Sequence, residues 1–350
     1  SELDLAMEDL PIRITDENQL GRPDQVVAKA LKSRVLLYAA SPLFNGNKEY
    51  AEFKNHDGTN LINQTYSIEK WKKAADAAKA VIDALPGGLY KQFNAENKLD
   101  PFASYRDLFF DKWNKEVIWA YRTDQAGTWE WNGGLVQVGG YANYGVTQQL
   151  VDAYFMNNGQ RPITGYDANG APIININSGY VESGVANEPG KYTRAGIWNM
   201  YVNREPRFYA TITYNGSEWV WHGNDGDQVW YAEFFATGKD GVQGGARGQD
   251  ITRSGYVIRK YNSPNSDVFN RRLIPNASWI IFRLGEFYLN YAEALNECDP
   301  GNPDILVYLN LIRERAGIPQ YGNGLNALPV PNNQAEMREL IRAERRIELV

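Results

Sequence analysis

The stretch SWIIFRLGEFYLNYAEALNE, residues 278–297, decides the fold. Apolar side chains recur in it every three or four residues, at Ile280, Ile281, Leu284, Phe287, Tyr288, Tyr291, Ala292 and Leu295. This spacing predicts one helix with a wide buried face, with Ser278 as its N-cap and Pro300 beyond its end. Arg283 and Glu286 are spaced as a local ion pair on that helix. Since each large side chain contributes about 1.5–3 kcal/mol when buried, we expect this helix at the centre of the core.

Helices are also predicted on both sides of this stretch. Residues 26–41 are apolar nearly all round and are expected to form a buried helix. Residues 67–85 combine an apolar face with alanines that let another helix approach closely, as in helical hairpins of the tetratricopeptide type. Amphipathic helices are expected over 305–317 and from Asn333 onward. The chain is therefore predicted to be mainly α.

The composition argues against several classes of protein. Of the 350 residues, 43% are hydrophobic and 22% charged, as is typical of globular proteins. The net charge of −6 argues against nucleic acid as the main partner, and no run of about 18 apolar residues could span a membrane. Cys298 is the single cysteine, and His56 and His222 lie far apart in loop-like sequence. We therefore predict no internal disulfide, no histidine-based catalytic site, no metal site and no cofactor.

Aromatic residues are more abundant than a soluble core requires, with 10 Trp and 22 Tyr. Trp71, Trp119 and Trp279 fall in regular elements and are expected to pack in the core. The excess of Trp and Tyr indicates a surface that binds something flat and polar.

Two long stretches, residues 122–146 and 157–275, are interpreted as loop and hairpin insertions. The first is rich in glycine and aromatic residues, lacks helical or strand periodicity, and is long enough to be functional. In the second, Asn215-Gly216 is expected to turn a preceding strand back into the strand EWVWHG, residues 218–223. Residues 167–170 are expected to form a hairpin turn rather than a calcium loop, because the later glutamate ligand is missing.

Several stretches, taken in order, resemble the SusD/RagB family of Bacteroidetes. They are RVLLYAASPLFN, WKKAADAAKAVID, TQQLVDAYF, EPRFYATI, WIIFRLGEFYLNYAEALNE, LNLIRERAGIP and IRAERRIEL. The resemblance runs over nearly the whole chain, and the pair FRLGEFYLNYAEALNE and LNLIRERAGIP is its most specific part.

The resemblance implies a single SusD-like domain over residues 1–350, with a tetratricopeptide-like helical-repeat scaffold, long loops and a few short β-hairpins. It implies a glycan-binding lipoprotein at the cell surface, lipid-anchored in the outer membrane, that delivers oligosaccharides to a TonB-dependent transporter of the SusC type. The lipid-attachment cysteine, an N-terminal part and a segment after Val350 are expected in the full-length protein. Membrane association is expected only through that lipid anchor.

The sharpest hypothesis for the ligand site is an aromatic platform in the loop before the TQQLVDAYF helix. Sugar rings stack their C–H faces on indole and phenol rings, each stacked contact contributing about 1 kcal/mol beyond burial. The ligand-binding residues predicted in this loop are Trp129, Trp131, Asn132, Tyr141, Asn143 and Tyr144. Trp219 and Trp221, on one face of the EWVWHG strand, are a second candidate group. The alternative is that these rings fix the loops to the scaffold.

Two other functions remain open at this point. A glycoside hydrolase needs two carboxylates in a cleft, and Glu130, Asp225 and Asp227 lie beside tryptophans in the sequence, although no hydrolase signature surrounds them. A non-catalytic helical-repeat scaffold that binds proteins would explain the helices but not the aromatic loops. We therefore expect no enzyme. A structural calcium ion is compatible with such loops, but its position is not predicted.

Overall fold

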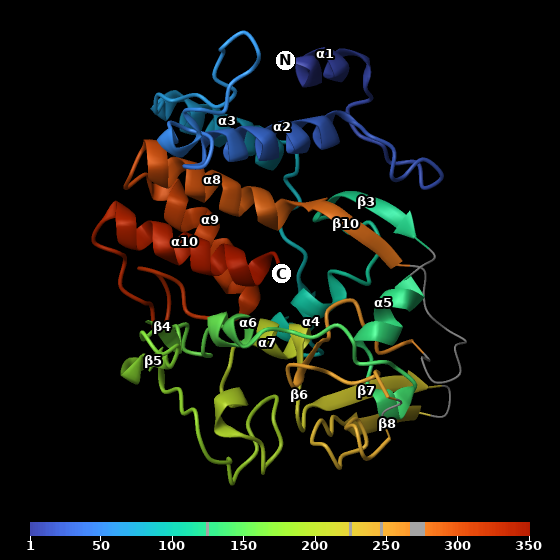
Figure 1. Cartoon of the computed structure of the whole chain (residues 1–350). Helices are drawn as coiled ribbons and strands as arrows, with labels where there is room; N and C mark the ends of the chain where they lie inside the picture. The colour runs from blue at the N-terminus through green and yellow to red at the C-terminus, as the bar shows by residue number, and fades with distance from the viewer. Residues whose placement is uncertain (124–125, 224–225, 246–247, 267–276) are drawn as a thin grey trace.

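The computed structural model describes residues 1–350 except 124–125, 224–225, 246–247 and 267–276. Its helices are α1 (Glu2–Asp9), α2 (Gln25–Ala40), α3 (Ile68–Asp83), α4 (Pro101–Asp107), α5 (Ala126–Gly133), α6 (Gln148–Ala153), α7 (Pro206–Thr211), α8 (Leu284–Cys298), α9 (Pro303–Ala316) and α10 (Gln334–Glu348). The long helices α2, α3, α8, α9 and α10 stack in one half of the molecule, and the short elements and loops lie in the other half (Figure 1). The prediction of a mainly α scaffold is confirmed.

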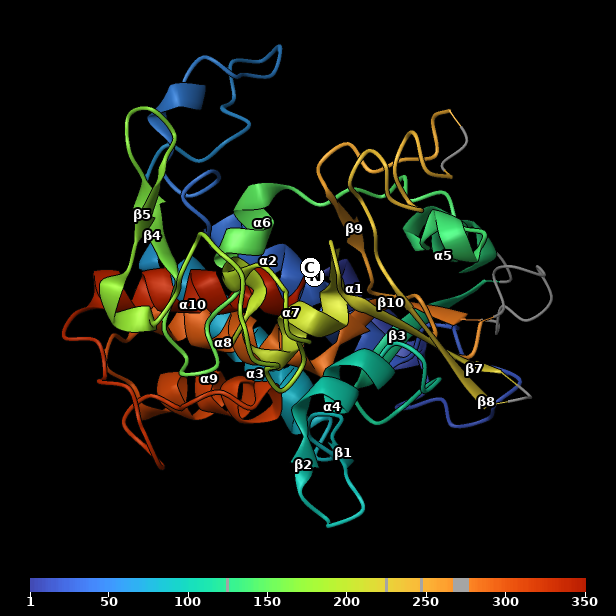
Figure 2. The same cartoon turned by 90° about the horizontal axis from the view of Figure 1, so that it is seen from below.

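The strands pair in antiparallel twos. The pairs are β1 (Gln92–Phe93) with β2 (Leu99–Asp100), β3 (Val117–Thr123) with β10 (Ala277–Arg283), β4 (Ile163–Tyr166) with β5 (Pro172–Ile174), β6 (Ile212–Tyr214) with β9 (Tyr256–Ile258), and β7 (Glu218–Gly223) with β8 (Gly226–Tyr231). The hairpins β1–β2 and β4–β5 project from different edges of the molecule (Figure 2). At the tip of β4–β5, Asp167 Oδ1 accepts hydrogen bonds from the backbone N of Asn169 and Ala171. This contact confirms the predicted hairpin turn.

The main core lies where α3 packs between α2 and α8. Ala74, Ala75 and Ala78 of α3 are buried there, as their small size predicts. Trp71 of α3 is also buried, as predicted. Gly317 ends α9 with a φ of 70°, a left-handed conformation that favours glycine. Local periodicity therefore placed α2, α3, α9 and α10 correctly.

The prediction of one helix over 278–297 is wrong in its first third. Residues up to Arg283 form β10, in which Trp279 pairs with Tyr121 of β3, and α8 begins only at Leu284. The β-branched Ile280 and Ile281 suit a strand, and pairing with a strand far away in the sequence overrides the local helical spacing. Trp279 is 40% exposed rather than part of the core.

The helix α2 is less buried than its composition predicts. One face of α2 packs on α3 and α8. On the rest of the helix Leu31, Val35 and Tyr38 are exposed, and Tyr38 is 58% exposed. Its apolar residues therefore exceed what the neighbouring helices of the described chain cover.

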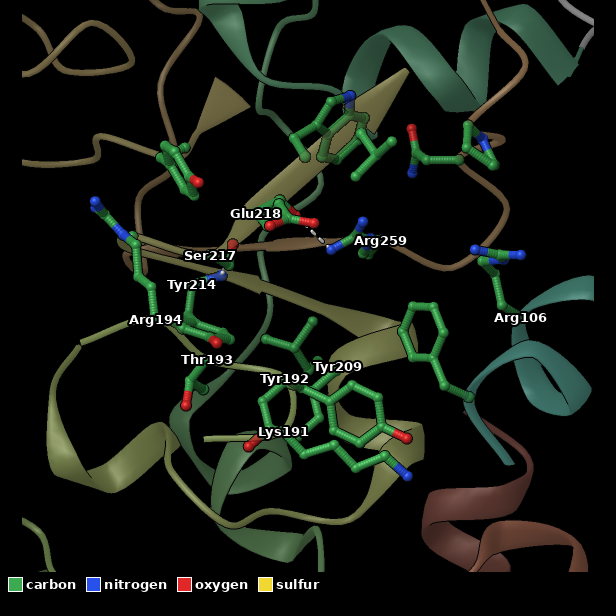
Figure 3. Close-up of a pocket in the computed structure, with 18 of the residues that line it drawn as sticks. Arg106, Lys191, Tyr192, Thr193, Arg194, Tyr209, Tyr214, Ser217, Glu218 and Arg259 are labelled. Carbon is green, nitrogen blue, oxygen red and sulfur yellow. Dashed lines mark hydrogen bonds between the residues drawn. The ribbon is translucent and has the colours of Figure 1, made fainter. Parts of the chain in front are cut away.

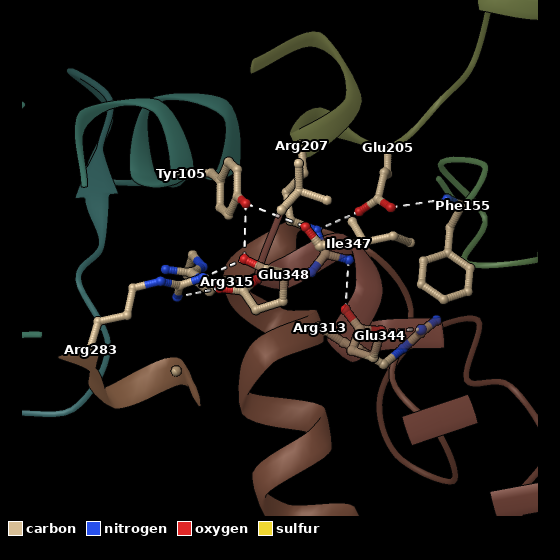
Figure 4. A network of polar contacts seen from close by, with 12 residues as sticks. Tyr105, Phe155, Glu205, Arg207, Arg283, Arg313, Arg315, Glu344, Ile347 and Glu348 are labelled. Atoms are coloured by element: carbon tan, nitrogen blue, oxygen red, sulfur yellow. Dashed lines mark hydrogen bonds and ion pairs between the residues drawn. The ribbon is translucent and has the colours of Figure 1, made fainter. Parts of the chain in front are cut away.

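A buried ionic network fastens the C-terminal helix to the rest of the scaffold (Figure 4). Its members are Arg207, Arg283, Arg313 and Arg315 with Glu116, Glu205, Glu344 and Glu348. The Glu348 carboxylate accepts from Arg207 at 3.0 Å, from Arg283 at 2.5 Å and also from Arg315.

The predicted local ion pair between Arg283 and Glu286 does not form. Arg283 instead binds Glu116 and Glu348, while Glu286 binds Arg34 of α2 at 2.5 Å. The reason is the strand-to-helix junction at Arg283, since the two residues do not share one helix.

The region 122–146 is more regular than predicted, since it contains α5 and a 3-10 turn, η2 (Val136–Val138). The hairpin expected around Asn215-Gly216 is also wrong in its pairing. β6 pairs with β9, which lies more than forty residues further along the chain, and β7 pairs with β8. No helix in the described part of the chain is long and apolar enough to cross a bilayer.

Candidate functional site

A cavity of about 400 Å³ lies between α4, the segment 190–194 and the strands β6 and β7 (Figure 3). We call it the tyrosine cavity. Its aromatic lining consists of Phe102, Tyr192, Tyr209, Tyr214, Trp219 and Tyr231. Pockets of roughly 300–1,000 Å³ with convergent aromatic and polar groups are the usual form of small-ligand sites. It is therefore the first place to look for a ligand.

Stacked rings support one wall of the tyrosine cavity. Tyr192 stacks on Phe102 with ring centroids 5.6 Å apart and lies 5.0 Å from the ring of Tyr209. Tyr209 is buried, and burial raises the pKa of its phenol to about 12. Its hydroxyl donates to the carbonyl of Tyr201 at 2.7 Å, which fixes the ring. Tyr192 is half-buried, so the wall offers a supported ring surface to a ligand.

Cationic side chains surround the same cavity. Arg106, Lys191, Arg194 and Arg259 line it from several sides. Arg259 Nη1 donates to the carbonyl oxygen of Glu218 at 2.6 Å, and its guanidinium lies 5.7 Å from the Trp219 ring. Burial, together with the nearby Arg106, lowers the pKa of Arg259 to about 10. The cavity thus combines rings with hydrogen-bond donors.

The predicted platform residues do gather in one place. Tyr141 N donates to the carbonyl of Trp131 at 2.6 Å, while the backbone N of Asn143 and of Tyr144 donate to the carbonyl of Asn132 at 2.8 Å and 3.0 Å. The segment after η2 therefore folds back along the end of α5.

Trp129 is held firmly by its neighbours. Its ring lies 4.8 Å from Tyr144 and 5.1 Å from Trp279, and its Nε1 donates to the carbonyl of Lys260 at 2.7 Å. It also lines a second cavity of about 420 Å³, together with Tyr38 and Trp279. Trp129 thus has a packing role, and its part in ligand binding stays a prediction.

The two tryptophans of β7 have different surroundings. Trp219 is buried with Leu135 and Val138, and it contributes to the wall of the tyrosine cavity. Trp221 is half-buried, lies 6.4 Å from the ring of Trp230, and stands outside that lining. The prediction for Trp219 and Trp221 as ligand contacts therefore remains untested.

Glu130 and Asp227, two of the carboxylates considered for hydrolysis, are poorly placed for it. Glu130 is 2% exposed and accepts a hydrogen bond from Ser263 N at 3.2 Å; burial raises the pKa of its carboxyl to about 7. Asp227 is exposed and binds His222 Nδ1 at 2.7 Å, and Asp225 lies outside the described residues. Among the residues that the structure describes, no three His, Cys, Asp or Glu side chains gather as metal ligands. The calcium ion stays a prediction without a position.

Comparison with known protein families identifies the family of this chain. The family model described as the SusD family matches residues 107–350. The chain belongs to the SusD family. The resemblance inferred from the sequence is thereby confirmed. SusD-like proteins bind carbohydrate and are not catalysts, in agreement with the expectation that the chain is not an enzyme.

Solved structures show the same fold. A protein named BT4246 matches with a TM-score of 0.77 and 24% identity, over 99% of this chain and 63% of that one. A SusD-like carbohydrate-binding protein from Bacteroides fragilis matches with a TM-score of 0.61 and 22% identity, over 100% of this chain and 54% of that one. A protein solved with a xylogluco-oligosaccharide matches with a TM-score of 0.53 and 16% identity, over 99% and 52%.

The chain therefore spans about half to two thirds of the length of these SusD-like proteins. The tetratricopeptide-like helical architecture predicted from the sequence is confirmed. The search of curated proteins found no match.

Apart from Trp219, the residues of the tyrosine cavity were not predicted from the sequence. Lys191, Tyr192 and Arg194 lie in a turn-rich segment, and Arg106 and Arg259 come from distant parts of the chain. The one local signal was the sequence KYTR, residues 191–194, which places two cations around a tyrosine in a loop.

Proposed function

We propose that this chain binds oligosaccharides in the tyrosine cavity, as the ligand-binding part of a SusD-family protein. The observation that carries the proposal is a cavity in which supported tyrosine rings and guanidinium donors converge, in a chain of a carbohydrate-binding family. A fold relative solved with a xylogluco-oligosaccharide supports the same ligand class.

The geometry suits a sugar. A pyranose ring presents an apolar C–H face to a ring such as Tyr192, while its hydroxyls accept from arginine and donate to backbone carbonyls at the rim. Each stacked ring contributes about 1 kcal/mol beyond burial. Two such contacts with a few hydrogen bonds correspond to a Kd of roughly micromolar to millimolar. An affinity in this range allows the ligand to be released again.

The wider role follows from the family. We propose that the full-length protein is lipid-anchored at the outer membrane, exposed at the cell surface, and passes its glycan to a TonB-dependent transporter of the SusC type. The family match supports this proposal. The platform at Trp129 and Trp131, with Asn132, Tyr141, Asn143 and Tyr144, is proposed as a second contact region for a longer glycan.

Titration with a panel of oligosaccharides, followed by intrinsic tryptophan fluorescence, tests the site. Trp219 in the cavity wall reports binding there. We expect Tyr192→Ala to weaken binding about tenfold, whereas Tyr121→Ala, which removes a 65% exposed tyrosine of β3, leaves binding unchanged. The variants Trp129→Ala and Trp131→Ala test the platform in the same assay.

The alternatives give different results. A protein-binding scaffold would show no response to any glycan, with either wild type or variant. A glycoside hydrolase would release reducing ends from the bound glycan. If the wild type and Tyr192→Ala bind a glycan equally well, the tyrosine cavity is not the site. The platform at Trp129 and Trp131 would then be the remaining candidate.

A further inference from the structure

We propose that the tyrosine cavity selects saccharides that carry an oxyanion, either the carboxylate of a uronic acid or a sulfate ester. This inference rests on the proposed glycan binding and names the class of glycan. It comes from one observation: three of the cations that line the cavity, Lys191, Arg194 and Arg259, form no ion pair within the described residues.

Arg259 is the deepest of these cations. Within the described residues its side chain forms no ion pair, and the one hydrogen bond of the guanidinium is the donation from Nη1 to the carbonyl of Glu218. A guanidinium presents its N–H groups as a planar fork that matches a carboxylate or a sulfate. Arg259 is half-buried, and partial burial of a charge without a counterion is unfavourable. An anionic ligand group that reaches Arg259 would therefore supply the partner that the protein does not.

Lys191 and Arg194 extend this positive surface to the rim. Both are exposed, and neither forms an ion pair with any residue in the described ranges. Lys191 Nζ lies 5.0 Å from the centre of the Tyr192 ring, and the Arg194 guanidinium lies 4.2 Å from that of Tyr231. These cation–π contacts hold the two charges beside the rings on which a sugar would stack. A charged substituent on a sugar bound beside these rings would thus meet a cation.

The remaining charges do not cancel this surface. Arg106 is largely neutralised by Asp107, with Nε 2.6 Å from Oδ1. Glu218 is the acidic residue of the described lining, and its single negative charge is outnumbered by the positive charges of Lys191, Arg194 and Arg259. The whole chain has a net charge of −6, so the positive lining is a local feature and not a consequence of composition. Fields focused in such a concave site attract ligands of opposite charge.

Calorimetric titration of the chain with three probes of equal length tests this inference. The probes are an oligogalacturonate, which carries carboxylates, a sulfated galactan oligosaccharide, which carries sulfates, and a neutral galacto-oligosaccharide. We expect at least one charged probe to bind about tenfold or more tightly than the neutral one in 20 mM NaCl. This difference should shrink in 500 mM NaCl, because salt screens the attraction. The two charged probes tell the carboxylate and the sulfate apart.

Charge-removing variants locate the effect. Arg259→Gln should weaken binding of the charged probe about tenfold to a hundredfold, and weaken the neutral probe far less, by at most the loss of one hydrogen bond to a hydroxyl. The double variant Lys191→Gln/Arg194→Gln alters only exposed side chains, so it keeps the test valid if Arg259→Gln does not fold. Arg22→Gln is the control, because Arg22 is exposed, lies outside the cavity lining and loses the same charge.

The outcomes separate the two proposals. Equal binding of charged and neutral probes, or equal losses for both in the variants, would overturn the selection of anions while glycan binding stands. Binding of charged probes that Arg22→Gln weakens as much as Arg259→Gln would also overturn it, since the attraction would then not belong to the cavity. If none of the saccharides binds, glycan binding itself fails, and this inference fails with it.

Discussion

The buried ionic network and the tyrosine cavity both gather arginines, but they treat them in opposite ways. In the network, Arg207, Arg283 and Arg315 all reach the carboxylate of Glu348. In the cavity, Arg259 meets a backbone carbonyl and an indole ring, and in the described chain it meets no carboxylate. The comparison teaches that the presence of a carboxylate partner, rather than the residue type, distinguishes an arginine that stabilises the fold from one that is available to a ligand.

The titration of these groups shows the same contrast. Burial alone would raise the pKa of Glu348, but Arg315, Arg283 and Arg207 hold it well below its usual range. Burial lowers the pKa of Arg259, and Arg106 adds to that effect. The network therefore stabilises the charged form of Glu348, whereas the surroundings of Arg259 destabilise its charged form.

The largest expected effect comes from breaking the network at its centre. Glu348→Gln would leave three buried guanidinium groups without their shared counterion, and should lower the free energy of unfolding by about 3–5 kcal/mol. Urea denaturation at pH 7 measures it. Glu339→Gln is the matched control on the same helix, because its ion pair with Arg342 is exposed and contributes at most about 1 kcal/mol. Equal losses in the two variants would mean that the network adds nothing beyond a surface pair.

Acidification should weaken the same network without mutation. The folded pKa of Glu348 is depressed, so its contribution is present above the unfolded pKa of about 4.5 and is lost as the pH falls below it. Urea denaturation from pH 6 to pH 3 should show a smaller loss for Glu348→Gln than for the wild type. Parallel curves would contradict the assigned pairing.

A smaller effect is expected at Glu130, a buried acid that forms no ion pair among the described residues. Its folded pKa is raised to about 7, so the folded state binds a proton more tightly and loses stability as the pH rises from about 4.5 through 7. Glu130→Gln keeps an acceptor for Ser263 N and should add about 2–3 kcal/mol at pH 8 but little at pH 4. The exposed Glu8→Gln serves as the control in urea denaturation at both pH values. The same gain at both pH values would rule out the burial of a charge as the cause.

The smallest effect is expected at Arg259. Arg259→Gln loses one hydrogen bond but relieves a half-buried charge that has no carboxylate partner among the described residues, so the free energy of unfolding should change by less than about 1 kcal/mol. Arg283→Gln, by contrast, removes a buried guanidinium that pairs with both Glu116 and Glu348, and should cost several times more. Thermal and urea denaturation of the two variants compare them directly. A loss at Arg259 as large as that at Arg283 would show that Arg259 holds the fold.

Sequence patterns correctly predicted the elements whose formation depends on residues close together in the sequence. The helices α3, α9 and α10 follow from apolar spacing and from caps such as Asn333 and Gly317, which act within a few residues. β10 was predicted as helix because its pairing with β3 joins residues about 160 positions apart. No local pattern contains that contact.

The candidate site shows the same limit. Trp219 was singled out for its aromatic character and does line the cavity. Tyr192, Arg106 and Arg259 were not, because they come together only after α4, the segment 190–194 and the chain after β9 have packed. The composition indicated an aromatic binding surface, but it could not indicate which rings would face a cavity.

The direct passage from β10 to α8 has a consequence for exchange with solvent. No loop separates Arg283 from Leu284, and the Arg283 side chain is fastened by Glu116 and Glu348. Opening of the ribbon β3–β10 near this junction would also break the ionic network. The amide hydrogens at the end of β10 should therefore exchange with deuterium as slowly as those of α8. The two-stranded ribbon β7–β8, which no such ionic network holds in the described chain, should exchange far faster.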